Sequence, residues 1–335
     1  MVGKVVVTAI KIFATCLVFA VCFVVGGALS GLSKAAQQAT PSTATLQAPS
    51  QQQATSSTPE APANQTPSQR PENLLYPLLI FSVSVGVVLS YLILRSSWHG
   101  WTLVGAIFVG MYGISTVATQ VETLFFLSNK LPHGMIRAIF LQGAITAALF
   151  APLAVLLLGK WRTSSPARAT SPPSRWHAPS VATRLAVIVL AFVFLYMFFG
   201  YYVAWQSPAV RQYYGGPEQP SFFAALQANW MRNPWVYALQ VFRALLYAAC
   251  MYPLIRMLRV ARWETALATA LFLSVWTTLL LLPNPFMPPD VAYAHFRETL
   301  GFSIVFGGIA GWLLSNRKTL LGALLGPERL VAEIR

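Results

Sequence analysis

Charged residues are scarce in this chain, and acidic residues are the scarcest of them. Only 10% of the 335 residues are charged, and 9 acidic residues stand against 23 lysines and arginines. A soluble domain carries about a quarter charged residues, so this sequence has too few to form a water-facing surface. With 56% hydrophobic residues and a mean hydropathy of +0.58, the composition predicts a protein that lies in a lipid bilayer.

Cysteine is also rare, and the motifs of common enzymes are missing. The three cysteines, Cys16, Cys22 and Cys250, all lie inside apolar runs, so there is neither a disulfide framework nor a CxxC metal pattern. The sequence contains no HExxH, GxSxG or phosphate-loop motif. It therefore predicts no metal site, no cofactor and no catalytic residue, and an enzyme is the less favoured class.

The excess of basic residues gives the chain a net charge of +14. In a soluble protein this charge would favour a nucleic-acid partner. In a membrane protein, however, basic residues gather in cytoplasmic loops and fix the orientation of the helices. The bilayer is thus the predicted partner and nucleic acid is not expected. A small solute and a membrane-protein partner are left open.

Long apolar runs recur along the chain. A bilayer core about 30 Å thick is crossed by roughly 20 apolar residues in a helix, and eight runs approach that length. We therefore predict an all-α polytopic integral membrane protein with eight transmembrane helices. The runs cover residues 5–29, 74–94, 102–124, 139–158, 185–205, 235–254, 266–282 and 300–314, the last extended upstream from Asp290.

The N-terminal part divides into two segments. Residues 1–29 form a first transmembrane or signal-anchor helix, and its length favours an uncleaved anchor over a signal peptide. A signal peptide cleaved near Ala28 and Ser30 would leave seven spans. Residues 30–73 have no aromatic residue and are rich in Ser, Thr, Gln, Pro and Ala, which predicts a disordered linker. A seven-helix bundle over 74–316 and an amphipathic tail over 317–335 follow.

The loops carry an uneven share of the basic residues. Counted in alternate loops, 14 lysines and arginines fall on the side of Lys4 and 7 on the side of Lys34. This bias places the first side in the cytoplasm. It predicts a multi-pass protein of the plasma membrane with both termini inside and residues 30–73 extracytoplasmic.

Small residues and one amphipathic stretch complete the architecture. Helices in lipid approach closely at small residues, and three spans have them at four-residue spacing. Residues 221–231 place aromatic and aliphatic side chains near helical spacing, which predicts a segment that lies flat on the membrane. The small residues are Ser82, Gly86 and Ser90, then Ala266 and Ala270, and finally Ser303, Gly307 and Gly311.

Polar residues within the spans mark the candidate site, because polar groups are costly at membrane depth. Glu122 is the single acidic residue within the eight apolar runs, counted without the upstream extension of the last, and Arg243 lies about 12 Å into the sixth span at about 1.5 Å per residue. We predict that these two side chains approach each other. The full set of candidate binding residues is Ser115, Thr119, Gln120, Glu122, Gln142, Gln240, Arg243, Tyr247, His295 and Glu298.

Helical spacing places these residues on shared faces. Ser115, Thr119 and Glu122 share one face of the third span, and Gln240, Arg243 and Tyr247 share one face of the sixth. His295 and Glu298 fall at positions i and i+3 of the eighth span, and Gln142 in the fourth span could join the Glu122–Arg243 pair. All lie in the predicted outer half of the bundle.

Three hypotheses follow from this cluster. In the first, the protein binds or transports a small solute at the polar residues. In the second, it is a structural or accessory membrane protein whose polar residues only lock helices together. In the third, it is an intramembrane enzyme on a lipid-like substrate, which requires His295 and Glu298 to meet Glu122 around an open cavity.

Overall fold

A computed structural model describes residues 2–32, 74–127, 131, 134–162, 178–214, 219–283 and 287–315. Within these residues, eight helices are long and apolar enough to cross a membrane, and each overlaps one predicted run. This confirms the multi-pass helical character of the chain. The predicted linker, apart from residues 30–32, and the predicted tail lie outside the described residues.

Besides the spans, the described residues form two shorter helices, α8 and α9. Helix α9 forms within the predicted interfacial stretch and buries none of its residues, while α8 precedes it. The elements are α1 (Val2–Ser30), α3 (Leu75–Arg95), α4 (Gly100–Tyr112), η1 (Gly113–Ala118), α5 (Thr119–Leu127), α6 (Met135–Leu157), α7 (Ala178–Phe199), η2 (Gly200–Ala204), α8 (Pro208–Tyr214), α9 (Phe222–Arg232), α10 (Trp235–Met257), α11 (Arg262–Thr277), η3 (Thr278–Leu281) and α12 (Pro289–Ser315).

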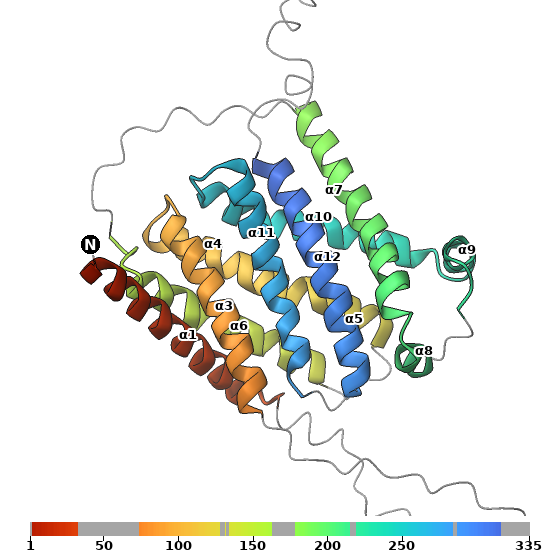
Figure 1. Ribbon diagram of the computed structural model, residues 1–335, viewed down its shortest axis with the longest axis horizontal. Helices are drawn as coiled ribbons and strands as arrows, with labels where there is room; N and C mark the ends of the chain where they lie inside the picture. Colours follow the sequence, from red (N-terminus) through yellow and green to blue (C-terminus); the bar gives the residue numbers. More distant parts are fainter. Residues whose placement is uncertain are drawn as a thin grey trace, which may run out of the picture.

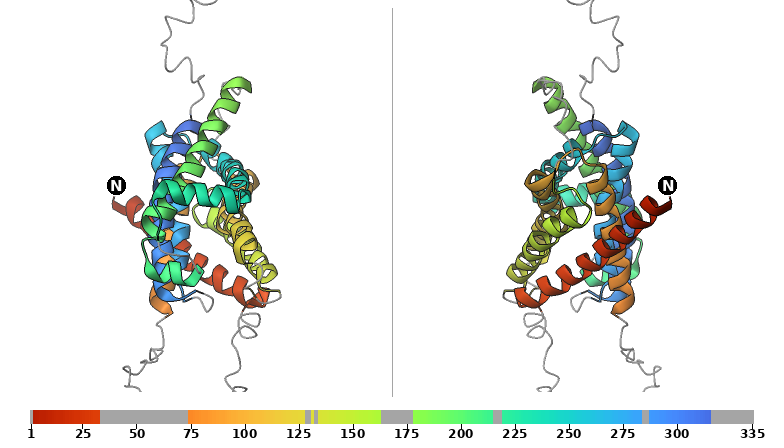
Figure 2. Two further views of the ribbon diagram at one scale, coloured as in Figure 1. Left: turned by 90° about the vertical axis from the view of Figure 1, so that its right-hand side faces the viewer. Right: turned by 90° about the vertical axis from the view of Figure 1, so that its left-hand side faces the viewer.

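The spans form two crossed layers that close into a ring. In Figure 1, α3, α11, α12 and α7 stand in one row, and α6, α4–α5 and α10 cross behind them. Helix α1 joins the layers at one edge by packing against α3 and α6, and α7 joins them at the other by packing against α12 and α10. The side views show α5 and α6 diverging from α12 towards one end (Figure 2).

The seam between α11 and α12 is built on small residues, as the sequence predicts. A Cβ atom added at Gly307 would lie 2.6 Å from the Cα of Ala270, and one at Gly311 would lie 2.9 Å from the Cα of Ala266. Both distances are far shorter than a real contact, so the two backbones approach each other at these points. Close approach of this kind holds helices together in lipid.

Helix α1 is part of the core of the bundle. Phe19 is completely buried, and its ring meets those of Phe81 and Phe150 edge to face, with centroids 5.3 Å away in both cases. A Cβ atom at Gly86 would lie 2.7 Å from the Cα of Cys16, so α1 and α3 also touch through their backbones.

One end of the bundle carries the arginines that the sequence places in the cytoplasm, and its loops are tied together. Ser96 and Leu258 form an isolated β-bridge. Lys160 donates from Nζ to the carbonyl of Ser96 over 2.8 Å, and burial lowers the pKa of this ammonium group. We call this end the arginine-rich end, and its described arginines are Arg95, Arg162, Arg184, Arg256, Arg259 and Arg262.

Two spans contain short π-helical segments that the sequence does not predict. Segment η1 joins α4 to α5, and η2 continues α7. A π-helical turn widens the helix by one residue and is frequent at functional sites. Both segments lie next to candidate site residues, because η1 precedes Glu122 and a Cβ atom at Gly200 in η2 would lie 3.5 Å from Oε1 of Glu298.

Candidate functional site

Arg243 on α10 is the centre of the candidate site. Its Nη2 lies 2.7 Å from Oε2 of Glu122 on α5, which confirms the predicted approach of these two residues. Its Nη1 donates to Oε1 of Gln240 over 2.8 Å, and its Nε donates to the carbonyl of Ala118 over 3.2 Å. Ala118 is the last residue of η1, so the π-helical segment supplies a backbone acceptor to the guanidinium group.

The two members of this ion pair differ in burial. The side chain of Arg243 is 6% exposed, whereas that of Glu122 is 30% exposed. An ion at membrane depth needs a partner or water, and here the arginine has protein partners while the carboxylate keeps an open side. Protein therefore encloses the guanidinium end of the pair but not the carboxylate end.

Three aromatic rings surround the guanidinium group. Its Cζ lies 5.7 Å from the ring centroid of Phe192, 5.9 Å from that of Tyr196 and 6.0 Å from that of Tyr247. Cation–π contacts of this range stabilise a desolvated arginine. Phe192 and Tyr196 come from α7, so the charge on α10 is held between α5 and α7.

A second pair lies on α12. Nδ1 of His295 lies 2.7 Å from Oε2 of Glu298, as their i, i+3 spacing predicts. Nε2 of the same imidazole lies 3.3 Å from the hydroxyl of Tyr214 on α8. Burial raises the pKa of this tyrosine well above its usual range, with further contributions from Tyr213 and the carboxylate of Glu298, so its hydroxyl stays protonated.

Tyr196 on α7 is related to both pairs. Its ring centroid lies 5.9 Å from Cζ of Arg243, and its hydroxyl interacts electrostatically with Glu122, Arg243 and Glu298. His295 also lies within range of the Glu122 charge. Four spans therefore contribute to one group of residues, which we call the polar network: Glu122, Tyr196, Gln240, Arg243, His295 and Glu298.

Gln240 leaves the polar network incomplete. The residue is fully buried, and its Oε1 accepts from Arg243. Its Nε2 has no hydrogen-bond partner among the residues that the structure describes. Leaving a buried amide donor unpaired costs about 1–3 kcal/mol, so a water molecule or a ligand with an acceptor group would fit this position.

Four predicted site residues have no hydrogen bond or ion pair with the polar network among the described contacts: Ser115, Thr119, Gln120 and Gln142. Thr119 donates to the carbonyl of Ser115 in its own helix over 2.6 Å, and the Ser115 hydroxyl lies 3.3 Å from that of Thr116. Oε1 of Gln120 is buried and has no partner in the described part of the chain. The amide of Gln142 lies against Gly27 of α1, so the structure corrects the expectation that Gln142 joins Glu122 and Arg243.

Two residues of the site were missed by the sequence analysis, Tyr196 and Tyr214. The available signal for Tyr196 was one hydroxyl within an apolar run of phenylalanine, valine and leucine. Tyr214 belongs to a short helix between spans, and nothing in its spacing relates it to His295. Both are found only once the helices are placed in space.

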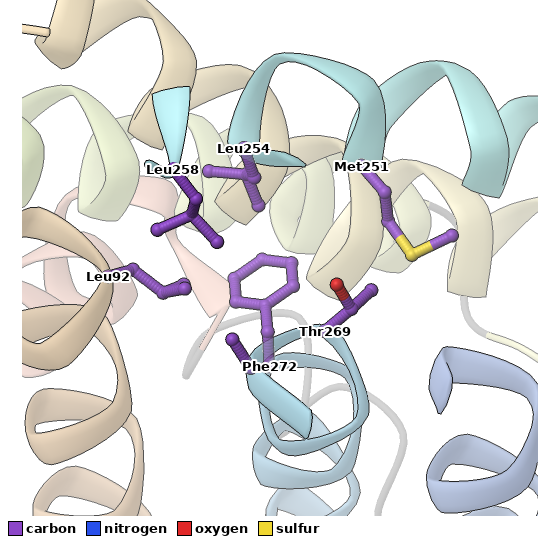
Figure 3. A pocket seen from close by; sticks show the side chains of 7 residues that line it. Leu92, Met251, Leu254, Leu258, Thr269 and Phe272 are labelled. Carbon is purple, nitrogen blue, oxygen red and sulfur yellow. The ribbon is translucent and has the colours of Figure 1, made fainter. Parts of the chain in front are cut away.

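An apolar cavity lies between α3, α10 and α11, nearer the arginine-rich end. Figure 3 shows side chains of Leu92, Leu254 and Leu258 around the ring of Phe272. Its volume of about 10 Å³ is close to the minimum for one water molecule. The hydroxyl of Thr269 at its wall already donates to Thr265 over 2.7 Å, so this cavity is a small packing gap and offers no polar group to a ligand.

Among the described residues, no group of three or more His, Cys, Asp or Glu side chains could hold a metal ion. The enzyme hypothesis needs a cavity that joins His295 and Glu298 to Glu122, and neither the apolar cavity nor a second one near Arg256 is lined by these residues. Comparison with known proteins gives no family, because no protein-family model, curated protein or solved structure matches the chain.

Proposed function

We propose that this protein binds and transports a small polar solute at the polar network. The observation that carries the proposal is the ion pair between Glu122 and Arg243 within the spans, next to the unpartnered amide of Gln240. Ionisable residues at membrane depth are costly and are found mainly at substrate and ion pathways. A solute with a hydrogen-bond acceptor would meet the Gln240 amide while its other groups face Glu122.

The arrangement of the spans supports movement at this site. Residues of the polar network come from both layers of the bundle, since α12 and α7 stand in one row and α5 and α10 in the other. A small shift of one layer against the other would change the distance between Glu122 and Glu298. The pair of His295 and Glu298 adds groups that can exchange a proton, as relay residues in transporters do.

We also propose an orientation for the chain. The arginine-rich end faces the cytoplasm of a cell whose plasma membrane holds the protein, by the excess of basic residues in its loops. Both termini are then inside, residues 30–73 are outside, and the polar network lies in the outer half. Helix α9 then rests on the outer surface, with Phe223 and Trp230 exposed towards the lipid.

Uptake by the purified protein tests the proposed function. The protein is reconstituted in liposomes on a solid-supported membrane, and currents are recorded after jumps of amino acids, organic acids, sugars and organic cations. We expect at least one class to give a current that Glu122→Gln abolishes. The matched control is Glu264→Gln, which breaks the ion pair with Arg95 at the arginine-rich end and leaves the polar network intact.

Two results would contradict the proposal. A folded Glu122→Gln protein that transports like the unchanged protein would remove the polar network from the pathway. A complete absence of response from the unchanged protein to every class would favour a structural role instead.

A structural role is the second candidate, and one observation favours it. All three nitrogens of the Arg243 guanidinium group have a partner on the protein. A polar group satisfied in this way can act as a lock between helices without any ligand. The two candidates predict different results. If the polar network is only structural, substitutions in it lower the stability of the protein and affect no solute.

A further inference from the structure

A second cavity lies at the arginine-rich end, where α10 ends, whereas Gln240 and Arg243 lie in the first half of the same helix. It is formed where α10 ends, α11 begins and α12 ends, and its volume is about 130 Å³. That is about ten times the space that one water molecule needs by the same measure. We call it the arginine pocket, and its polar lining residues are Arg256, Arg259, Arg262, Thr265 and Ser315.

The charges in this pocket are uncompensated within the described part of the chain. None of the lining residues is acidic, and none of its arginines takes part in a described salt bridge. Glu264 is near in sequence, but it pairs with Arg95 and accepts from the hydroxyl of Tyr91. An anion in the cavity would supply the missing negative charge to the three arginines that line it.

A further arginine strengthens the positive field. Arg184 on α7 is 2% exposed, and one of its guanidinium nitrogens donates to the carbonyl of Leu313 over 3.4 Å. Its charge interacts unfavourably with that of Arg262. Four arginines from three helices and one loop therefore act on the same region.

The guanidinium group of Arg262 packs against an aromatic ring. Its Cζ lies 4.3 Å from the ring centroid of Trp312. Its Nε is buried without a hydrogen-bond partner among the described residues. Arg262 is also the first residue of α11, which begins without a side-chain cap, so the first amides of the helix add positive potential.

We propose that the arginine pocket binds a phosphate group, carried either by an anionic lipid headgroup or by a free phosphate. Several guanidinium groups around one small space suit the multiple oxygens of a phosphate, which they can bind in bidentate fashion. The pocket lies at the ends of membrane spans, where lipid phosphates are found. Apolar walls from Ile255, Leu258 and Leu314 would contact the glycerol part of a lipid.

Thermal unfolding of the full chain in an uncharged detergent tests this proposal. The probes are dioctanoyl phosphatidic acid, dioctanoylglycerol, which lacks the phosphate, and inorganic phosphate. We expect phosphatidic acid to raise the melting temperature in a saturable way and dioctanoylglycerol to leave it unchanged. Arg256→Gln should weaken the apparent affinity about tenfold, the usual loss of one charge-assisted contact.

Comparing the two phosphate probes separates the two sources of phosphate, and a variant that lacks a distant arginine controls for the loss of charge. A response to both phosphatidic acid and inorganic phosphate supports a site for phosphate itself, and a response to the lipid alone supports a headgroup site. Arg232→Gln removes an exposed charge at the opposite end and should change nothing. If Arg256→Gln does not fold, Arg259→Gln replaces it, because Arg259 is exposed.

Two results would overturn the proposal. One is the absence of any shift with either phosphate probe. The other is a shift in Arg256→Gln or Arg259→Gln that equals the shift of the unchanged protein, since the anion would then bind elsewhere.

Discussion

Oε2 of Glu122 lies 2.7 Å from Nη2 of Arg243, and this contact joins α5 to α10 inside the bundle. The arginine is almost fully buried, whereas the carboxylate is 30% exposed. Removing Glu122 and removing Arg243 therefore lower the free energy of unfolding by different amounts, because the charge that remains is buried in one case and partly exposed in the other.

A double-mutant cycle measures this relationship. Glu122→Ala should lower the free energy of unfolding by about 3 kcal/mol, because it leaves the buried guanidinium group unpaired. The double variant Glu122→Ala with Arg243→Met should lose less than the sum of the single losses, with a coupling of about 1–3 kcal/mol. Unfolding of the purified protein by sodium dodecyl sulfate in mixed micelles provides the free energies. Strictly additive losses would mean that the two charges do not interact.

The seam between α11 and α12 gives a prediction with an internal control. Gly307→Leu should lower the free energy of unfolding by about 1–3 kcal/mol, the usual cost of overpacking, because its Cβ atom would overlap the backbone at Ala270. Gly308 has no neighbouring atom within 4 Å, so Gly308→Leu should leave the stability nearly unchanged. Equal effects of the two substitutions would show that the seam is elsewhere.

The mass of the mature protein tests the place of α1. We expect the purified chain to retain residues 1–32, because their removal would take the buried ring of Phe19 out of the core. Intact-mass spectrometry of the protein extracted from membranes measures this directly. A chain that begins just after Ala28 or Ser30 would identify the first run as a signal peptide.

The proposed orientation can be tested by labelling in whole cells. A cysteine at Ser56 should react with a membrane-impermeant maleimide in intact cells, because residues 30–73 are predicted to be outside. A cysteine at Arg259 should react only after the membrane is opened. The opposite pattern would invert the protein in the membrane and would place the polar network in the inner half.

The sequence predicted the spans and the central ion pair for simple physical reasons. The thickness of the bilayer sets the length of a span, so eight apolar runs are visible without any structure. Glu122 and Arg243 could be paired because few charges occur within the spans, and an isolated charge there requires a partner. Gly307 and Gly311 could be placed at a seam because helices in lipid approach each other closely at small residues.

The rest depended on how each helix is rotated and on its local backbone. Gln142 lies in a span that is apolar on all sides, so nothing in its spacing indicates that its amide faces Gly27. Thr119 donates to its own helix, which is an alternative open to any threonine in a span. The π-helical segments have no sequence signal, and the interaction of Tyr196 with Glu122, Arg243 and Glu298 follows from the packing of α7.

A polar network that admits a solute must open to water, and the accessibility of a cysteine at position 240 measures this opening. Gln240 is fully buried in this structure, so a thiol there reacts only if the site opens. Cys16, Cys22 and Cys250 are first replaced by alanine, and the negative control is Phe242→Cys, two residues along the same helix and exposed on the outside of the bundle. We predict that an impermeant methanethiosulfonate reagent labels Gln240→Cys from outside and spares Phe242→Cys. The contradicting result is a cysteine at the exposed Asn229 of α9 that reacts while Gln240→Cys stays unlabelled. The polar network would then be closed to water and would only hold helices together, so it would not bind a solute.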